Sequence, residues 1–361
     1  MSDQIKIPCL FMRGGTSRGP YFLKSDLPED IKQRDKILLA VMGSPDVRQT
    51  DGLGGADPVK SKVAIISKSN EPGIDVNYHF AQVKIDEPIV DTKPSCGNIL
   101  VGVGPFAVER GLVDPKNGET KVVIRDVNTG MKIEEIVQTP DKKVSYDGDL
   151  KIDGVPNTGT PVKIRFIDSI GSKTSKLFPT GNKIDKVNGY DCTFVDAAMP
   201  VVFFKAESFN VTGDEAYQDL SNNKKLIEEM DKVRIELGKL VGFGDVSKSV
   251  IPKVALVMKG SNGNIKSRYF MPWSCHQGYA ITGSIALAAA SKTKGTICSD
   301  FYENYSDNGI FEIEHLTGIS KIDLTIKRNI LGEIEDLVVS TIRHARLIMD
   351  GHVYVQKSKL K

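Results

Sequence analysis

The chain has 361 residues, more than one hydrophobic core usually serves, so two domains are the first expectation. Hydrophobic residues make up 40% and charged residues 26%, and the formal charge of +2 gives no electrostatic basis for a nucleic-acid or membrane-surface partner. The start of the chain lacks an apolar signal core, no apolar run approaches the roughly 20 residues of a membrane span, and the five cysteines form no CxxC pair, so a cytoplasmic protein with reduced thiols is expected.

The first part of the sequence predicts a hairpin, a helix and a strand in succession. Residues 9–13 and 20–23 are apolar runs joined by a glycine-rich turn, which is typical of a β-hairpin. An amphipathic helix is expected near Glu29 to Met42, followed by a strand over residues 61–66. A further helix is expected to open at Cys96-Gly97 and to run to about Arg110.

The second part of the sequence repeats these elements in the same order. Residues 192–196 and 200–204 predict a hairpin, Pro252-Lys253-Val254-Ala255 echoes Ser61-Lys62-Val63-Ala64, and a second helix is expected to open at Thr282-Gly283-Ser284. An amphipathic helix lies after the hairpin, with apolar residues at three- and four-residue steps: Leu226, Met230, Val233, Leu237 and Leu240. Four matches in order indicate an internal duplication.

The duplication predicts an α/β (α+β) protein of two pseudo-equivalent domains, each a mixed sheet wrapped around a central helix. The turn-rich residues 176–188 predict the join, which gives an N-terminal domain over 1–183 and a C-terminal domain over 184–361. A cleft between paired domains is a usual place for a small-molecule site.

Cys96 stands where the first central helix is expected to begin. Unpaired N–H groups and the partial positive charge of a helix start favour a thiolate there, and such a sulfur can take a proton from carbon and return it elsewhere. Gly97 lets a ligand approach the backbone, so the N–H groups of Gly97 and Asn98 are candidates to hold a carboxylate. The alternative is a buried structural thiol, and at this stage both remain open.

Lys62 stands at the start of an apolar strand, after the glycine-rich residues 51–56. A lysine at a cleft can bind a carboxylate, favour a nearby thiolate or stabilise an enolate as charge develops. The alternative is a solvated lysine at a strand end. Lys253 repeats the pattern in the second half, and the sequence leaves open which lysine acts.

The loop Arg13-Gly14-Gly15-Thr16-Ser17-Arg18-Gly19 combines two cations, two hydroxyls and three glycines. Such a loop can present backbone N–H groups as an anion-binding nest, although an ordinary hairpin turn explains it equally well. Neither a P-loop nor a dinucleotide fingerprint is present.

His276 follows Cys275 and precedes the second predicted helix opening. It is a candidate to orient a substrate carboxylate, with a structural histidine as the equal alternative. Cys275 is better explained as a buried structural thiol, and the scattered histidines predict no metal site.

A series of ordered motifs now identifies a resemblance. The sequence resembles the PrpF family, which includes 4-oxalomesaconate tautomerase, 2-methylaconitate isomerase and methylitaconate isomerase. The motifs that carry the resemblance are residues 12–19, 43–46, 51–57, Ser61-Lys62, Cys96-Gly97-Asn98, 104–107, 151–156, Phe178-Pro179-Thr180-Gly181-Asn182 and 349–355.

The resemblance implies the diaminopimelate epimerase fold and a cofactor-independent isomerase without a metal. It places the family's catalytic lysine and cysteine on Lys62 and Cys96, and the loop serine and the second-half histidine on Ser17 and His276. Diaminopimelate epimerases have a cysteine at both helix openings, whereas the second position here is Thr282, a poor acid–base group. Proton transfer on one face of the substrate is therefore favoured over epimerisation.

The resemblance implies a small anionic polycarboxylate as substrate, with neither nucleic acid nor membrane as partner. Cys96 and Lys62 are the expected catalytic pair, and the expected substrate-binding residues are Arg13, Thr16, Ser17, Arg18, Gly97, Asn98, His276, Thr282, Gly283 and Ser284. Residues 51–57 and 269–273 with His276 look closest to 4-oxalomesaconate tautomerases.

Several alternatives stay open. The same chemistry on methylitaconate or 2-methylaconitate is the nearest, an amino-acid epimerase is disfavoured by Thr282, and a carboxylate-binding protein without catalysis is the alternative of another class. The sequence is compatible with a monomer or a homo-oligomer.

Overall fold

The computed structural model describes residues 3–152, 154–271 and 273–360. Asp153 and Pro272, which belong to two of the motifs of the resemblance, lie outside the described residues. The chain divides into two compact units, which are described separately. Unit 1 comprises Met1–Arg165 and Thr341–Lys361, and unit 2 comprises Phe166–Ser340.

Unit 1 contains most of the elements of the first part of the chain together with the last strand. Its helices and strands are β1 (Gln4–Gly14), β2 (Ser17–Leu23), α1 (Ile31–Met42), β3 (Lys62–Lys68), β4 (Val76–Val83), β5 (Val90–Asp91), α2 (Gly97–Leu100), α3 (Val103–Glu109), β6 (Gly118–Asp126), β7 (Lys132–Thr139) and β17 (Ala345–Gln356), with short 3-10 turns at Lys24–Asp26, Pro58–Lys60, Pro140–Lys142 and Lys357–Leu360.

Unit 2 follows a similar course. Its helices and strands are β9 (Asp185–Val187), β10 (Tyr190–Ala197), β11 (Met199–Lys205), α4 (Tyr217–Asn222), α5 (Lys224–Leu240), β12 (Lys253–Lys259), β13 (Ile265–Phe270), α6 (Ile281–Ser291), β14 (Asn308–His315) and β15 (Gly318–Arg328), with 3-10 turns at Ala206–Phe209 and Cys298–Phe301. Strands β8 (Val162–Ile167) and β16 (Ile334–Arg343) each contain one of the points where the chain changes unit.

The pairing of strands confirms the predicted duplication. In unit 1, β1 pairs with β2 antiparallel, β2 with β3 parallel, β3 with β4 antiparallel, β4 with β6 parallel and β6 with β7 antiparallel. Unit 2 repeats this alternation from β10 to β15 through β11, β12, β13 and β14. Both sheets are therefore mixed, with the same order of parallel and antiparallel neighbours.

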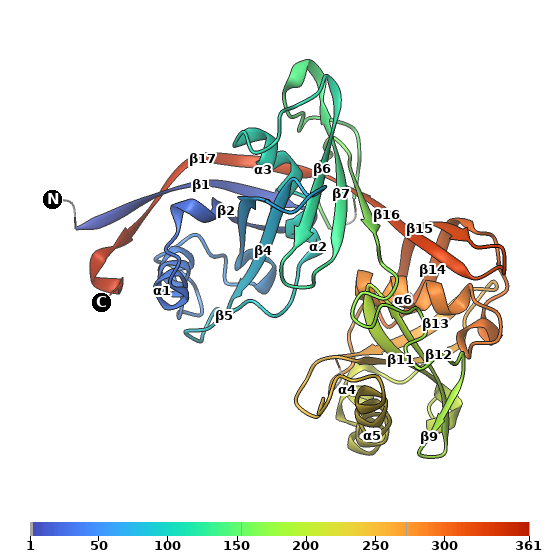
Figure 1. Ribbon diagram of the computed structural model, residues 1–361. Helices are drawn as coiled ribbons and strands as arrows, with labels where there is room; N and C mark the ends of the chain where they lie inside the picture. Colours follow the sequence, from blue (N-terminus) through green and yellow to red (C-terminus); the bar gives the residue numbers. More distant parts are fainter. Residues whose placement is uncertain (1–2, 153, 272, 361) are drawn as a thin grey trace. The chain divides into compact units, whose positions relative to one another are not determined.

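An amphipathic helix covers one face of each sheet (Figure 1). Helix α1 begins at the cap Asp30, whose carboxylate accepts from Gln33 N–H at 2.8 Å, and ends at Gly43 with φ 77°. In unit 2, α5 buries the predicted apolar stripe except Leu240, which is 68% exposed because the helix ends there. With 17 residues α5 is the longest helix described, and none of the described helices has the length and apolarity of a membrane span.

The opposite face of each sheet holds the central helix. Tyr21 of β2 donates a hydrogen bond to Ile99 O of α2 at 2.5 Å, while the neighbouring Phe22 packs in the core under α1. The prediction of one helix to about Arg110 is wrong, because α2 ends at Leu100 and α3 starts at Val103. Pro105 explains the break, since it has no N–H to donate to Val101 O and its ring crowds that carbonyl.

Strand β17 belongs to unit 1 although it lies at the far end of the chain. It pairs antiparallel with β1 from Gln4↔Gln356 to Gly14↔Ala345, and the two strands lie side by side (Figure 1). The compact units therefore differ from the sequence-based ranges 1–183 and 184–361 at residues 166–183 and 341–361. At residues 341–361 the physical reason is this long-range strand pairing, which no local pattern predicts.

Candidate active site

Cys96 is the residue from which the site is built. It occupies the cap position of α2, with extended backbone angles of φ −136° and ψ 106°, and its residue is half-buried. The other four cysteines are buried, and burial raises the pKa of Cys9 and Cys275 to about 11 and that of Cys192 to about 12. Cys96 is thus the cysteine with access for a substrate.

The backbone at Cys96 leaves donors unused by the helix. The first hydrogen bond within α2 runs from Leu100 N–H to Cys96 O at 3.0 Å, so the N–H groups of Gly97, Asn98 and Ile99 have no partner inside the helix. Because α2 has four residues, its dipole is small. These N–H groups, rather than the positive end of a long helix, are what the turn offers to an anion.

Two buried side chains hold the Cys96 turn in place. Tyr78 of β4 donates its hydroxyl to Cys96 O at 3.1 Å, and Ser95 Oγ donates to Asp126 Oδ2 at 2.5 Å. Burial raises the pKa of Asp126, but the carboxylate also accepts from the N–H groups of Asn128 and Thr129 at 2.9 and 3.2 Å. The side chain of Ser95 and the backbone carbonyl of Cys96 are therefore both anchored to the sheet.

Glu135 lies beneath the second part of the central helix. It is fully buried on β7, and its Oε2 accepts from Gly104 N–H at 2.7 Å, which caps the start of α3. Its Oε1 has no hydrogen-bond partner within the described residues. Burial raises the pKa of Glu135 to about 8, so the carboxyl is protonated at neutral pH.

The hairpin loop packs directly against the Cys96 turn. Asn98 donates its side-chain amide to Thr16 Oγ1 at 3.1 Å, and Thr16 N–H points to Asn98 Oδ1 at 3.4 Å. A Cβ at Gly14 would lie 2.2 Å from Asn98 O, and one at Gly15, which has φ 49°, would lie 2.1 Å from Asn98 Oδ1. These glycines permit the close approach of loop and turn.

The loop does not present an open anion nest. Gly15 N–H donates to His344 O at 3.1 Å, and Thr16 N–H is directed to Asn98, so both donors at the tip are occupied. Arg13 is also engaged, since its guanidinium donates to Gly15 O, His344 O and His344 Nδ1 at 2.8, 3.1 and 2.8 Å. Arg13 therefore shapes the loop.

Ser17 and Arg18 lie on opposite faces of the hairpin. Ser17 pairs with Gly14 on the face that Asn98 covers, is 1% exposed, and its hydroxyl has no partner among the described residues. Arg18 lies on the other face, with its guanidinium carbon 5.6 Å from the ring of Phe11. Within the described residues, the Ser17 hydroxyl and the buried Nε of Arg18 both lack a hydrogen-bond partner, so these two side chains are the donors of this loop that are left for a ligand.

Lys62 begins β3, and both α2 and β2 contact this strand. Its ammonium donates to Gln82 Oε1 at 2.7 Å and lies 5.1 Å from the ring of Phe80. A Cβ at Gly19 would lie 1.8 Å from Lys62 O, so the hairpin rests on the lysine's backbone. Its polar partner is a neutral amide, which leaves the positive charge uncompensated there.

In unit 2, Tyr269 brings together three of the predicted residues. The ring of His276 packs edge-on against Tyr269 with the ring centroids 6.3 Å apart, and a Cβ at Gly283 would lie 2.6 Å from the Tyr269 ring. Burial raises the pKa of Tyr269, and the Thr282 side chain beside its hydroxyl lowers it. Because Gly278 N–H donates to His276 Nδ1 at 3.0 Å, the ring proton of neutral His276 is on Nε2. This ring therefore presents an N–H donor.

Ser284 does not offer its backbone to a ligand. Helix α6 begins at Ile281, which places Thr282 inside the first turn, whereas Cys96 is a cap residue. Ser284 N–H donates to Ala280 O at 2.8 Å and its hydroxyl to the same oxygen at 3.2 Å, and the residue is 1% exposed. The expectation that this N–H binds a carboxylate is wrong for that reason.

The family model described as PrpF protein matches residues 4–356 of this chain. The chain belongs to the PrpF family. YbhH of Escherichia coli (strain K12), a relative with a provisional isomerase name, is 46% identical over 351 residues, covering 97% of this chain and 99% of YbhH. The (4E)-oxalomesaconate Delta-isomerase of Novosphingobium sp. (strain KA1) is 43% identical over 350 residues, covering 96% and 97%.

The crystal structure of a methylitaconate-delta-isomerase is similar to this chain, with a TM-score of 0.82 and 38% sequence identity, covering 100% of this chain and 98% of that one. The similarity confirms the predicted family and fold class. Within the described part of this family member, no group of three or more His, Cys, Asp or Glu residues is placed to hold a metal.

Lys253 is the counterpart of Lys62 in this PrpF-family chain. It begins β12 as Lys62 begins β3, and burial together with the nearby Arg234 lowers its pKa to about 8. Arg234 itself is buried and donates to Asp231, Ser249 O and Val246 O at 2.6, 3.0 and 2.9 Å. The two lysines therefore differ in their surroundings, because Lys62 lies beside a neutral amide and Lys253 near a buried arginine.

Several residues of the site were not identified from the sequence of this PrpF-family member. They come from strands and loops that only the fold brings to the Cys96 turn or the hairpin: Tyr21, Tyr78, Gln82, Asp126, Glu135 and His344. For Glu135 the sequence contains one indication. It lies two residues from Ile133 and from Val137, so it shares with them the face of the strand that points to the core.

Proposed function

We propose that this chain is an isomerase that moves a proton on an unsaturated di- or tricarboxylic acid, with Cys96 as the acid–base group. The isomerase class agrees with the names of the PrpF-family relatives. The observation that carries the proposal is the Cys96 turn. An accessible thiol stands beside N–H groups that no helix bond uses, and buried side chains hold it in place.

The proposed reaction starts with a carboxylate of the substrate on the N–H groups of Gly97 and Asn98 and on the Ser17 hydroxyl. Cys96, as thiolate, removes an acidic C–H proton, and the electron pair left behind delocalises into the conjugated carboxyl or keto group. Lys62 stabilises this dienolate, because its ammonium has an amide rather than a carboxylate as its polar partner. The thiol returns the proton to another carbon or to oxygen, and the thiolate is restored.

Substrate and product have the same formula, so the step involves no net redox change and the proposed isomerase is cofactor-independent. Thr282 is a poor acid–base group, which favours transfer on one face of the substrate. His276, Thr282 and Gly283, gathered around Tyr269, are proposed substrate contacts. A cytoplasmic enzyme with reduced thiols remains part of the proposal.

The substrate that we propose first is 4-oxalomesaconate. The chain is 43% identical to the (4E)-oxalomesaconate Delta-isomerase and 41% identical to the 4-oxalomesaconate tautomerase of Pseudomonas putida. The alternatives are methylitaconate and 2-methylaconitate, after the printed names of other relatives. Turnover of the three acids side by side, followed by absorbance of the conjugated product, separates them.

The catalytic assignment is tested by Cys96→Ala and Lys62→Ala. Loss of an acid–base group costs roughly 10²–10⁴ in rate, so kcat for Cys96→Ala should fall by that factor. Lys68→Ala, at the far end of the same strand, is the matched control and should keep full turnover. Lys253→Ala shows which of the two lysines acts.

Incorporation of solvent deuterium at carbon provides a second readout. The native protein should exchange the transferred hydrogen, and Cys96→Ala should not. If folded Cys96→Ala and Lys62→Ala both turn over normally, the assignment is wrong. Saturable binding of the acids without any exchange at carbon would instead indicate a carboxylate-binding protein.

A further inference from the structure

Unit 2 contains a cavity of about 800 Å³ that the proposed reaction does not use. Its wall includes five cationic side chains, those of Lys176, Lys183, Lys292, Lys294 and Arg328, and one carboxylate, that of Glu333. The whole chain has a formal charge of +2. Five cations and one carboxylate give the wall a net charge of +4, which exceeds the net charge of the whole chain.

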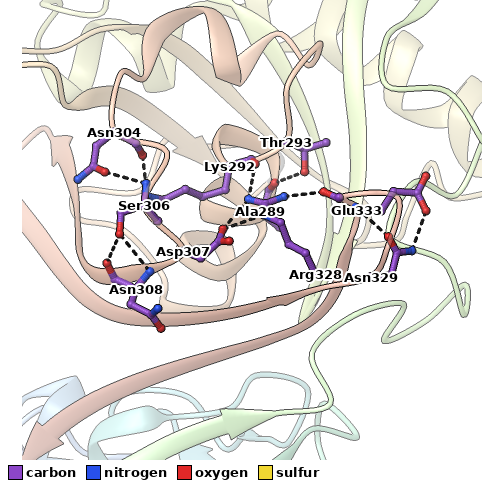
Figure 2. A network of polar contacts seen from close by, with 11 residues as sticks. Ala289, Lys292, Thr293, Asn304, Ser306, Asp307, Asn308, Arg328, Asn329 and Glu333 are labelled. Atoms are coloured by element: carbon purple, nitrogen blue, oxygen red, sulfur yellow. Dashed lines mark hydrogen bonds and ion pairs between the residues drawn. The ribbon is translucent and has the colours of Figure 1, made fainter.

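Two of the five cations are fixed in the frame of the cavity (Figure 2). Lys292 is 4% exposed, and its ammonium donates to Asn304 O and Ser306 O at 2.6 and 2.7 Å. Arg328 donates to Asp307 Oδ1, Gly332 O and Lys292 O at 2.8, 3.0 and 3.0 Å. These bonds connect the end of α6, the loop before β14 and the end of β15, so the hollow has a preorganised wall.

The other three cations are exposed and uncompensated. Within the described residues, Lys176, Lys183 and Lys294 have no carboxylate at ion-pair distance. The nearby Asp307 forms its ion pair with Arg328. Lys294 lies 5.5 Å from the ring of Tyr305, and the Lys183 side chain passes 3.5 Å from the position of a Cβ at Gly295. Like charges that are gathered in this way repel one another and focus a positive potential into the hollow.

The motif Phe178-Pro179-Thr180-Gly181-Asn182, which the proposed reaction leaves unexplained, forms part of the wall. Thr180 Oγ1 and Asn182 Nδ2 donate to the two oxygens of the buried Asp185 at 2.8 and 2.9 Å, and Gly181, with φ 86°, closes the turn. Asp185 is thereby used to hold the turn instead of neutralising a lysine. Phe178 and Leu177 add an apolar surface beside the cations.

From this geometry we infer that unit 2 has a second binding site, for an organic anion with several negative charges and an aromatic or aliphatic part. The three exposed lysines bind the charges, and Phe178, Leu177 and Tyr305 contact the apolar part. The volume lies within the range of small-molecule sites. Phosphates and carboxylates share this chemistry, and the inference is independent of the isomerase activity.

Isothermal titration of the full chain with two probes tests the site: adenosine triphosphate as the phosphate and benzene-1,2,4,5-tetracarboxylate as the carboxylate. At least one of the two probes should bind with a stoichiometry of one per chain, and uncharged adenosine should not bind. The triple variant Lys176→Glu, Lys183→Glu, Lys294→Glu should bind at least roughly 100-fold more weakly. The loss of three exposed charge pairs, each worth roughly five-fold at contact distance, already gives this factor, and the introduced carboxylates add repulsion.

The matched control carries the same change of charge outside the cavity. It is Lys224→Glu, Lys225→Glu, Lys232→Glu on the exposed side of α5, and it should bind as the native chain does. An equal loss in both triple variants would show a general charge effect and overturn the site, as would no binding of either probe by the native chain. Lys62→Ala should retain binding, and a loss there would place the probe in the catalytic site and also refute the inference.

Discussion

The buried carboxyl of Glu135 allows a quantitative test of the helix packing beneath Cys96. The perturbation is Glu135→Gln, which keeps the shape of the side chain and removes its titration. The amide oxygen of glutamine can accept the Gly104 N–H bond that Glu135 Oε2 accepts at 2.7 Å. At acid pH the two proteins should therefore have similar free energies of unfolding.

The difference should grow as the pH rises. In the unfolded chain the carboxyl loses its proton near pH 4.5, whereas burial raises the pKa of Glu135 to about 8 in the folded chain. Between these values the folded native protein binds one more proton than the unfolded chain, so its free energy of unfolding falls with rising pH and levels off above about pH 8. One pH unit corresponds to about 1.4 kcal/mol, so between pH 5 and pH 8 the variant should gain about 3–4 kcal/mol relative to the native protein.

Urea unfolding of both proteins at pH 5 and pH 8 measures this change. Glu119→Gln, on the exposed side of the neighbouring β6, is the control and should shift by the same small amount at both pH values. A native-to-variant difference that is equal at pH 5 and pH 8 would refute the reasoning, because the carboxyl would then titrate alike in the folded and unfolded chains.

Three further outcomes are expected. Gly19→Ala should lower the free energy of unfolding by about 1–3 kcal/mol in urea, because its Cβ would meet Lys62 O at 1.8 Å, while Gly351→Ala, with its closest contact at 3.9 Å, should have little effect. Tyr78→Phe removes the hydrogen bond to Cys96 O. One hydrogen bond contributes about 0.5–1.5 kcal/mol, so kcat should fall about 2- to 12-fold with little change in KM. An unchanged kcat would contradict the positioning role. Iodoacetamide should label one thiol per folded chain and none in Cys96→Ser, since the other four cysteines are buried; mass spectrometry showing several fast sites would speak against it.

The elements that local patterns predict are those whose buried face is set by the spacing of apolar residues within the element itself. The two hairpins, the strands from Lys62 and Lys253 and the amphipathic helices α1 and α5 follow from apolar periodicity and lie where expected. The break between α2 and α3 also had a local cause in Pro105, which the helix prediction did not use. Leu240 continues the apolar pattern of α5, but it is the last residue of the helix and is exposed, whereas Val241 and Phe243 just beyond it pack against the core. Periodicity cannot show where the chain leaves the helix.

In the candidate site, too, some residues could be predicted from local sequence and others could not. Cys96, Gly97 and Asn98 could be selected because a thiol and a glycine at a helix start have a local physical meaning. Tyr78 and Asp126 could not, because their roles depend on β4 and the end of β6 lying next to Ser95 and Cys96 in the folded chain. The hydrogen bonds of Arg13 could not be predicted for the same reason, since its partner His344 is 331 residues away.

The pairing of β17 with β1 has a consequence for synthesis. During translation the ribosome releases all of unit 2 before the strand that completes unit 1 emerges, so the first half must wait with one edge of its sheet unpaired. A nascent or prematurely terminated polypeptide would expose that edge, and the enzyme becomes whole only when its final strand closes over the first.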